Sequence, residues 1–346
     1  MGRRITLAAT ALALAMAGLA CGDDEAATEG PRSGGEVEAP DGFRISEVVD
    51  GLDGPTQMVL DADGALVVAH LNGAEDGGDG QVLRIDLDRR DAEPEVLFDG
   101  LVSPTGVAVL DDEIWVMEER TLSRGPIEGG ELEVVLDDLP FNGRSEGTLT
   151  ATPDGDLLYN TSGALDGTSA AEGSATLFSL TPGRDPVPLA TGFKHAYARV
   201  LDADGTLWQT EVSEGSFGGD PIPDELVSVE PGDDFGWPRC VGDRVPVELN
   251  EGTEELCADT PRSHVVFEPA ATPTSVEVAP WDPDLLVVAL WVEGRVVTVP
   301  RQQGEGPVEP TTFVSGIEHP QHLLADGDRL LVSDHETGRI LAVERA

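Results

Sequence analysis

One phrase recurs six times in this chain: a short turn, an apolar strand, a turn rich in Asp and Gly, and a second apolar strand. Most copies follow one another after about 45–50 residues, the length of one four-stranded propeller blade. The fifth copy is looser than the others. The six copies begin at Gly54, Ser103, Gly147, Ala196, Pro273 and Pro320. The repeat predicts an all-β, six-bladed propeller of four-stranded antiparallel blades over residues 41–346.

Shorter apolar segments follow most of the copies and supply a third strand to each blade. Gln81–Asp86 and Gly338–Val343 are two of them. Apolar and polar residues alternate in these segments, or Val-rich runs stand between Gly-containing turns, and no helical period competes with this pattern. Phe43–Val49 precedes the first copy, and we expect it to close the ring beside the C-terminal strands. The fourth blade carries a long insertion, residues 212–269.

The turn sequence Asp-Ala-Asp-Gly occurs twice, at Asp61–Gly64 and Asp202–Gly205. It resembles the start of a calcium loop, but neither copy has a glutamate at the twelfth position or the further ligands of such a loop. Both segments are therefore expected to be hairpin turns.

The N-terminus has the features of an export signal. Arg3 and Arg4 precede an apolar run, and small residues lead to Cys21. This pattern predicts a lipoprotein-type signal peptide over residues 1–20, with Cys21 carrying the lipid. The alternative is ordinary secretion with Cys21 as a free thiol. Residues 21–40 are rich in Gly, Asp, Glu, Ala and Pro, which is typical of a flexible acidic tether. The predicted location is the cell envelope, on its periplasmic or extracellular side.

The chain is strongly acidic, with 66 acidic and 21 basic residues and a net charge of −45. Lys194 is its one lysine. The charge is spread along the whole sequence and opposes binding to nucleic acids or to anionic membrane surfaces. The membrane contact that we expect is therefore the N-terminal lipid alone.

Cys240 and Cys257 are the cysteines that remain after Cys21. They stand in a loop-like segment of an exported chain, where disulfides form readily. No further cysteine and no histidine at ligand spacing accompanies them, so a metal site is the weaker alternative. The sequence predicts a disulfide.

In a propeller, the segments that lead into the innermost strands meet around the central axis at one face, where a ligand site is expected. Among the polar residues in these segments, Arg144 and Lys194 stand out in so acidic a chain. They suggest a pocket for an anionic or polyol ligand. The alternative is that they only neutralise Glu146 and nearby carbonyl groups. His319 and His322 could share a metal, but Pro320 between them favours plain loop histidines.

Four segments in the fourth blade follow one another in a recognisable order: Gly192–Ala198, Asp204–Glu211, Pro223–Leu226 and Gly232–Cys240. In this order they resemble the glucose/sorbosone dehydrogenase family. Its members are soluble quinoproteins that oxidise sugars with pyrroloquinoline quinone and calcium on a six-bladed propeller. The resemblance extends from about Gly51 to the C-terminus.

The resemblance implies a set of site residues. Arg144 stands where the family has its catalytic histidine, and a guanidinium does not act as a general base near neutral pH. Glu146 or His195 could replace that base. The positions that would contact the quinone are Gln57, Thr148, Lys194, His195 and Trp291. Gly219 and Asp220 align with residues whose main-chain carbonyls would face the calcium ion.

Three functions follow from these observations. The first is a quinone-dependent sugar dehydrogenase at the cell surface. The second is a non-catalytic propeller of the same descent that binds a sugar, a polyol or a protein. The third, a calcium-dependent hydrolase of the lactonase type, lacks a set of carboxylates at the axis. The missing carboxylates place the third function last. The arginine at the histidine position argues against catalysis in the first function, although the resemblance still makes a dehydrogenase the best single label.

Overall fold

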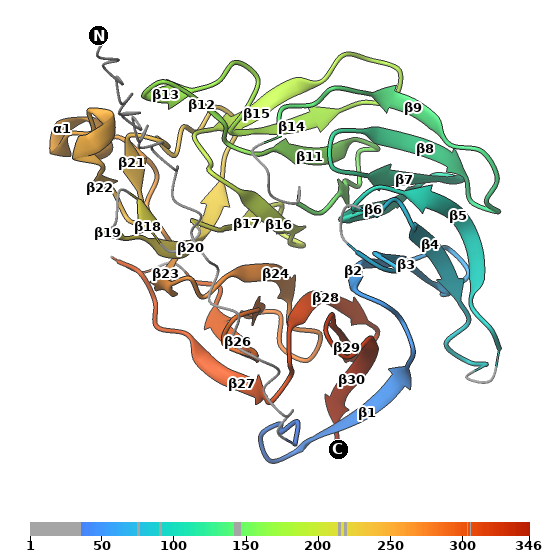
Figure 1. The fold of residues 1–346 in the computed structure, drawn as a ribbon. Coiled ribbons are helices and arrows are strands. Elements are labelled where there is room, and N and C mark those ends of the chain that lie inside the picture. Colours follow the sequence, from blue (N-terminus) through green and yellow to red (C-terminus); the bar gives the residue numbers. More distant parts are fainter. Residues whose placement is uncertain are drawn as a thin grey trace, which may run out of the picture. The chain divides into compact units, whose positions relative to one another are not determined.

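A computed structural model describes residues 36–346, except 75–76, 90–91, 142–146, 214–215, 218–219, 303 and 305. All described residues belong to one compact unit, Gly34–Ala346. This unit contains six four-stranded antiparallel sheets arranged around a common centre (Figure 1). The prediction of an all-β, six-bladed propeller is confirmed.

The first three blades follow the first three copies of the repeat. Blade one contains β2 (Pro55–Leu60), β3 (Leu66–His70), β4 (Gly80–Ile85) and β5 (Glu95–Leu101). Blade two contains β6 (Gly106–Leu110), β7 (Glu113–Met117), β8 (Leu122–Pro126) and β9 (Glu133–Leu136). Blade three contains β10 (Thr150–Ala151), β11 (Leu157–Thr161), β14 (Thr176–Leu180) and β15 (Val187–Thr191), with the hairpin β12 (Leu165–Asp166) and β13 (Ser169–Ala170).

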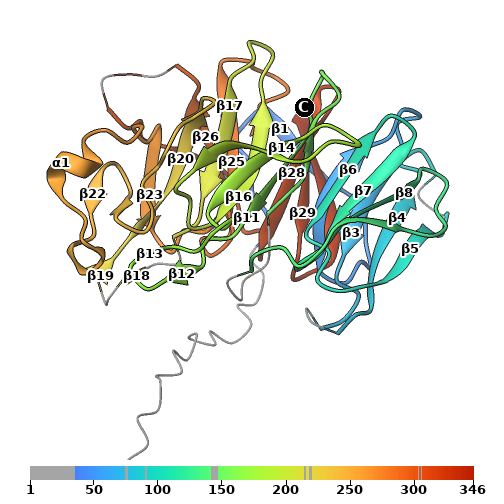
Figure 2. The same cartoon turned by 90° about the horizontal axis from the view of Figure 1, so that it is seen from above.

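The last three blades complete the ring. Blade four contains β16 (Ala196–Leu201), β17 (Leu207–Glu211), β20 (Pro223–Val229) and β23 (Val265–Pro269). Blade five contains β24 (Pro273–Val278), β25 (Leu285–Leu290), β26 (Arg295–Pro300) and β27 (Thr311–Ser315). Blade six contains β28 (Pro320–Asp326), β29 (Arg329–Asp334), β30 (Arg339–Arg345) and β1 (Phe43–Val49). Figure 2 shows the strands running between the two faces of this unit.

The ring closes as the sequence predicts, because the outermost strand of blade six comes from the other end of the chain. β1 pairs antiparallel with β30, and Phe43 lies opposite Arg345 and Ile45 opposite Val343. One blade thus contains both ends of the propeller. Unfolding that blade therefore requires separating strands about 300 residues apart in sequence.

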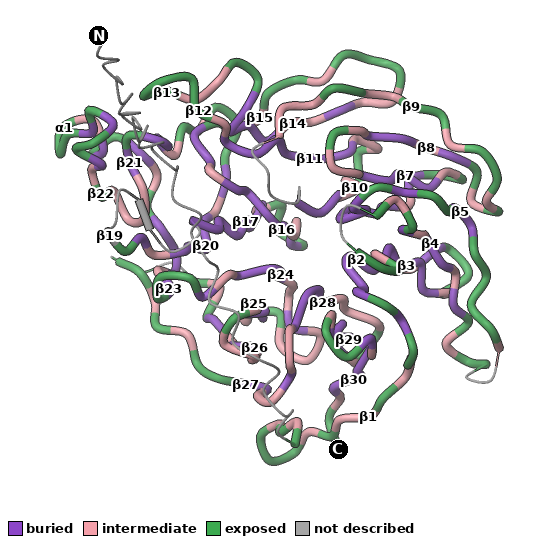
Figure 3. Tube along the Cα trace, in the orientation of Figure 1, coloured by how far each residue is buried: buried purple, intermediate pink, exposed green. Residues whose placement is uncertain are grey.

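Apolar contacts between neighbouring blades form the core. Met58 and Leu66 of blade one pack with Leu331 and Ile340 of blade six in one buried cluster, and similar clusters lie at the other blade junctions. Inner and middle strands are mostly buried, whereas the outer strands expose many residues (Figure 3). Each fully buried Val or Leu side chain contributes about 1.5–3 kcal/mol to folding. The short Val- and Leu-rich runs of the sequence are therefore the strands that the two flanking blades cover.

The fourth blade carries the predicted insertion, but residues 212–269 also include two strands of the blade itself, β20 and β23. The added segments precede and follow β20. They contain β18 (Ser216–Phe217), β19 (Asp220–Pro221), β21 (Cys240–Val241), β22 (Val245–Pro246), the 3₁₀ turn η1 (Glu248–Asn250) and the helix α1 (Glu254–Cys257). Cys240 and Cys257 are joined by a disulfide, which confirms that prediction.

The predicted signal peptide, the lipidation site Cys21 and residues 21–35 of the predicted tether lie outside the described residues. The end of the tether is described, and its residue Glu38 forms an isolated antiparallel bridge with Ser315 of β27. The end of the tether is thus attached to blade five before β1 begins. No helix in the described part of the chain is long and apolar enough to cross a membrane.

Candidate functional site

The predicted site residues that the structure describes lie at one face of the propeller, where the chain leads into the innermost strands; we call it the mouth face. Gln57 belongs to β2, Thr148 precedes β10, and Lys194 and His195 precede β16. Trp291 follows β25, and its N–H donates to the carbonyl of residue 272 just before β24 (3.0 Å). Arg144, Glu146 and Gly219 lie outside the described residues, and of Asp220 only the main chain, in β19, is described.

The buried side chain of Gln57 connects three blades. Its carbonyl oxygen accepts hydrogen bonds from the main-chain N–H groups of Val107 in β6 (2.9 Å) and Leu149 beside β10 (2.8 Å). Its amide nitrogen donates to the main-chain carbonyl of Leu149 (2.7 Å). Three of the four hydrogen bonds that a glutamine can make are thus used within the protein. Gln57 is a clasp between blades one, two and three.

Tyr197 and Gln321 meet across the centre of the ring. They belong to β16 and β28, in blades four and six, which are separated by blade five. Gln321 Nε2 donates a hydrogen bond to the Tyr197 hydroxyl (2.5 Å), and both side chains are buried. The Tyr197 ring also lies edge-on to His195, with 5.3 Å between ring centroids. These contacts link the first residues of blade four to those of blade six.

Arg199 holds blade three against blade four and uses the main chain of Thr148. Its buried guanidinium donates to Asn160 Oδ1 (2.7 Å), to Gln209 Oε1 (2.8 Å) and to the carbonyl of Thr148. Thr148 in turn donates its N–H to the carbonyl of Tyr197 (2.7 Å), and its hydroxyl lies 3.4 Å from the same oxygen. The polar groups of Thr148 are therefore engaged in contacts between blades.

Lys194 and His195 are fixed to the end of β17. Their main-chain N–H groups both donate to Glu211 Oε1, at 2.6 and 3.2 Å. The Lys194 ammonium donates to the carbonyl of Ser213 (3.0 Å). The side chain of Lys194 is only partly buried, whereas His195 is buried. This arrangement holds the segment before β16 rigidly and keeps the one lysine of the chain next to the mouth face.

Two buried carboxyl groups lie behind this segment. Glu211 and Glu225 are opposite each other on β17 and β20, and both line a chamber of about 20 Å³. Burial raises the pKa of Glu225 to about 7. Burial, together with the charges of Glu225 and Asp224, raises the pKa of Glu211 well above its ordinary value. Near neutral pH these glutamates therefore hold protons that an exposed carboxyl group would lose.

Trp291 forms a ring stack with two histidines. Its indole is parallel to the imidazole of His319, with centroids 4.3 Å apart and an angle of 5° between planes. His335 lies tilted against the indole at 4.9 Å and its Nδ1 lies 3.1 Å from the carbonyl of Pro55. His319 Nδ1 lies 3.7 Å from a carboxylate oxygen of Glu336. The half-exposed stack joins blades five, six and one at the mouth face.

His319 and His322 have different surroundings. His319 precedes β28, whereas His322 lies within that strand, so the prediction of loop histidines is wrong for His322. His322 is buried between blades six and one, where its Nδ1 accepts a 3.4 Å hydrogen bond from the N–H of Met58. Burial lowers the pKa of His322 to about 3. Within the described ranges, no three His, Cys, Asp or Glu side chains are close enough together to hold a metal ion.

The quinone and calcium that the resemblance implies would need side chains or carbonyl groups that are free to bind them. Pyrroloquinoline quinone is an anion and needs cationic or hydrogen-bonding groups that are directed at it. In the described part of the site, Gln57 and Thr148 bind the main chain of other blades, and the Lys194 ammonium binds Ser213. Trp291 carries no charge. The described residues therefore fit the quinone poorly.

Sequence patterns missed several residues that shape the mouth face. Gln321 was visible only as a polar residue in the sixth copy of the repeat, and Arg199 lies within an apolar strand. Glu211 is the last residue of β17 and Glu225 lies near the start of β20, and nothing in the local pattern shows that they lie opposite each other. A charged residue inside a predicted inner strand, as at Arg199, is the one signal that could have been used.

Solved structures of sugar-oxidising enzymes share this architecture. The holo form of the pyranose dehydrogenase PQQ domain from Coprinopsis cinerea matches with a TM-score of 0.73 and 16% identity, over 91% of this chain and 98% of that one. The PQQ-bound aldose sugar dehydrogenase from Streptomyces coelicolor matches with a TM-score of 0.68 and 17% identity, over 89% and 99%. The chain has the sugar dehydrogenase fold.

A third match is the calcium structure of a Trichoderma reesei protein of carbohydrate-active enzyme family AA12, with a TM-score of 0.71 and 17% identity, over 90% of this chain and 97% of that one. No protein-family model and no curated protein sequence matches the chain. At such low identity the likeness establishes the sugar dehydrogenase fold, and the residues of the mouth face must carry any argument about function.

Proposed function

We propose that this chain is an exported, lipid-anchored propeller that binds a small sugar or polyol at its mouth face and does not oxidise it. The observation that carries the proposal is that residues at the positions expected to contact the quinone are bound to other parts of the protein. Gln57 and Thr148 act as contacts between blades, and Lys194 is bound to Ser213, whereas the rest of the fold is intact.

The mouth face still offers the groups that a polyol needs. Trp291 and His319 are only partly buried there and supply an aromatic surface and an imidazole. A rigid scaffold of inter-blade hydrogen bonds fixes their positions, which lowers the entropy cost of binding. An uncharged ligand also avoids repulsion from the 66 acidic residues of the chain.

Export and lipidation complete the proposal. The signal sequence before Cys21 supports both, and the acidic composition suits a protein that is surrounded by water and not bound to the membrane surface. The lipid would keep the propeller in the cell envelope. Radiolabelled palmitate in the mature protein, absent after Cys21→Ala, is the expected result of a labelling experiment.

A second candidate function is a quinone-dependent sugar dehydrogenase in which His195 or Glu146 takes the proton. One observation favours it: His195 lies at the mouth face with its ring held against Tyr197. Histidine is the side chain that most often serves as a general base. In this function the loss of the histidine at position 144 would be compensated within the same site.

Titration of the purified chain with pyrroloquinoline quinone and calcium separates the two candidates. Absorbance follows quinone binding, and reduction of a dye follows turnover with a series of aldoses. We expect no turnover, and we expect Arg144→His to be the informative substitution if quinone binds. Saturable, quinone-dependent dye reduction by the unmodified chain would overturn the proposal and establish the dehydrogenase.

A further inference from the structure

A second cleft lies on the face opposite the mouth, between blades four and five. Its volume is about 930 Å³. The walls are the turn Asp202–Thr206 and residues 228–231 of blade four, and residues 284–285 and 300–302 of blade five. These segments connect strands at the end of the blades that is remote from Lys194 and Trp291. The cleft is therefore separate from the site described above.

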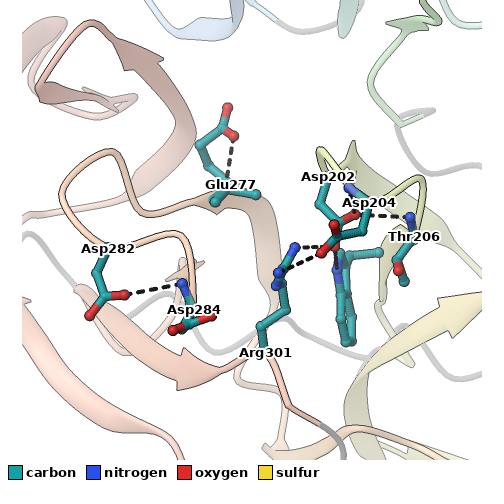
Figure 4. Close-up of polar contacts among 9 residues, drawn as sticks. Asp202, Asp204, Thr206, Glu277, Asp282, Asp284 and Arg301 are labelled. Atoms are coloured by element: carbon teal, nitrogen blue, oxygen red, sulfur yellow. Dashed lines mark hydrogen bonds and ion pairs between the residues drawn. The ribbon is translucent and has the colours of Figure 1, made fainter.

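Arg301 crosses from blade five to blade four at this cleft. Its guanidinium donates to Asp202 Oδ2 (2.9 Å) and to Asp204 Oδ2 (2.7 Å). Asp202 is buried and is also bound by Trp208 Nε1 (3.0 Å), so its position is fixed. The main-chain N–H of Arg301 donates to the main-chain carbonyl of Asp284 (2.8 Å). Figure 4 shows Arg301 between the turn that carries Asp202 and Asp204 and the turn that carries Asp284.

Blade one contains the same turn in a different setting. Asp61 and Asp63 repeat the Asp-Ala-Asp-Gly sequence, and both are bound by Arg84, at 2.7 and 3.0 Å. Arg84 belongs to β4 of the same blade, so this network stays within one sheet, whereas Arg301 spans two blades at a cleft. The turn alone therefore does not require a cross-blade arginine. Arg84 is a natural control for Arg301.

The cleft has the composition of a site for a neutral, hydroxyl-bearing ligand. The guanidinium of an arginine has five N–H donors. The ion pairs of Arg301 with Asp202 and Asp204 each use one of these donors, so further donors remain for a ligand. The carboxylates of Asp204 and Asp284 supply acceptors beside these donors. Leu285, Pro231 and Pro300 line the cleft and are at least partly exposed, so they offer an apolar surface for the C–H face of a sugar ring.

Charge also favours a neutral ligand. An anion would meet the carboxylates of Asp204, Asp284 and Glu230 next to the single cation Arg301. A cation would gain little specificity, because acidic residues cover the whole protein and salt screens them. The hydroxyl groups of a sugar both donate and accept, and so match a fixed carboxylate–guanidinium pair.

We propose that this cleft is an oligosaccharide-binding site, independent of the mouth face, in which Arg301 and Asp204 hydrogen-bond the sugar hydroxyl groups. The volume of the cleft exceeds that of one hexose ring. It therefore suits a short chain of sugar rings. The proposal does not rest on the function proposed for the mouth face.

Calorimetry and NMR of the purified chain with cellotriose, maltotriose and laminaritriose test this inference. The indole N–H of Trp208 is bonded to Asp202 beneath the cleft and reports on it; Trp208→Phe assigns its signal. We expect at least one trisaccharide to bind saturably and to shift this signal. Arg301→Gln should weaken that binding at least tenfold, whereas Arg84→Gln should leave it unchanged.

A second pair of variants guards against loss of folding in Arg301→Gln. Asp204→Asn changes a side chain that is 70% exposed and leaves the contact between Asp202 and Trp208 in place, and Asp63→Asn, at a side chain that is 85% exposed, is its control. Weaker binding in Asp204→Asn alone supports the site. The inference is overturned if none of the three trisaccharides binds, or if the variants in blades one and four affect binding equally. Trisaccharide binding with no monosaccharide binding at the mouth would contradict only the function proposed above.

Discussion

Replacing Gln57 by leucine distinguishes a ligand-binding residue from a clasp between blades. Leucine has a similar size but no polar atoms, so it removes the side-chain hydrogen bonds and keeps most of the packing. The sequence-based interpretation predicts that this change weakens ligand binding and leaves folding intact. The structure predicts the reverse, because the Gln57 amide binds the main chain of Val107 and Leu149.

The expected loss of stability follows from the groups that are left without partners. Gln57→Leu removes the hydrogen bonds of three buried main-chain groups. These groups are the N–H of Val107 and the N–H and carbonyl of Leu149. A buried polar group without a partner costs about 1–3 kcal/mol. Partial relaxation of the main chain reduces the sum, so we expect Gln57→Leu to lower the free energy of unfolding by about 3–6 kcal/mol.

Equilibrium unfolding in urea, followed by circular dichroism, measures this change. Gln302→Leu is the control, because Gln302 is exposed, and we expect it to change the free energy of unfolding by less than about 0.5 kcal/mol. A Gln57→Leu protein as stable as the control would refute the assignment of Gln57 as a clasp. If sugar binding were lost at the same time, Gln57 would belong to the ligand site.

Three further predictions concern stability. Cys240→Ser opens a disulfide that spans 17 residues and should lower the free energy of unfolding, measured in urea, by about 3 kcal/mol. Burial raises the pKa of Glu225 to about 7, so its contribution to stability is complete below the ordinary pKa of 4.5 and is lost as pH rises through 7. This loss is about 3 kcal/mol, and Glu225→Gln should remove that part of the pH dependence of the unfolding midpoint. Thr56→Val removes a hydroxyl that donates to the main-chain carbonyl of Pro104 (2.7 Å), with the carbonyl of Ala69 at 3.0 Å, and should cost about 1–2 kcal/mol in the same assay, whereas Thr105→Val, at a buried hydroxyl with no partner in the described structure, should cost nothing.

The sequence predicted the architecture well because each blade repeats a local pattern. The starts of the copies at Gly54 and Pro320 lie at or next to the first residues of β2 and β28. The closing strand Phe43–Val49 was found because it is an apolar segment outside the repeat, and a ring leaves it one place to pair. The insertion was less well bounded, since its predicted range of residues 212–269 includes β20 and β23, which are strands of the blade itself.

The contacts at the mouth face could not be predicted in the same way. Gln57 and Leu149 are 92 positions apart, and Tyr197 and Gln321 are 124 positions apart. Such pairs form only because the ring brings the first residues of different blades to the same level around the axis. Several polar side chains are then within reach of the same donors and acceptors, and a local sequence pattern does not show which hydrogen bonds form.

Binding of a small sugar at the mouth face is the central claim, and calorimetry tests it directly. Titration of the purified chain with D-glucose, D-galactose and D-mannitol should give saturable binding for at least one of them. Trp291→Leu at the mouth should abolish that binding, and Arg84→Gln on the opposite face should leave it unchanged. The absence of binding for all three compounds, or equal binding by the Trp291→Leu protein, would contradict the account.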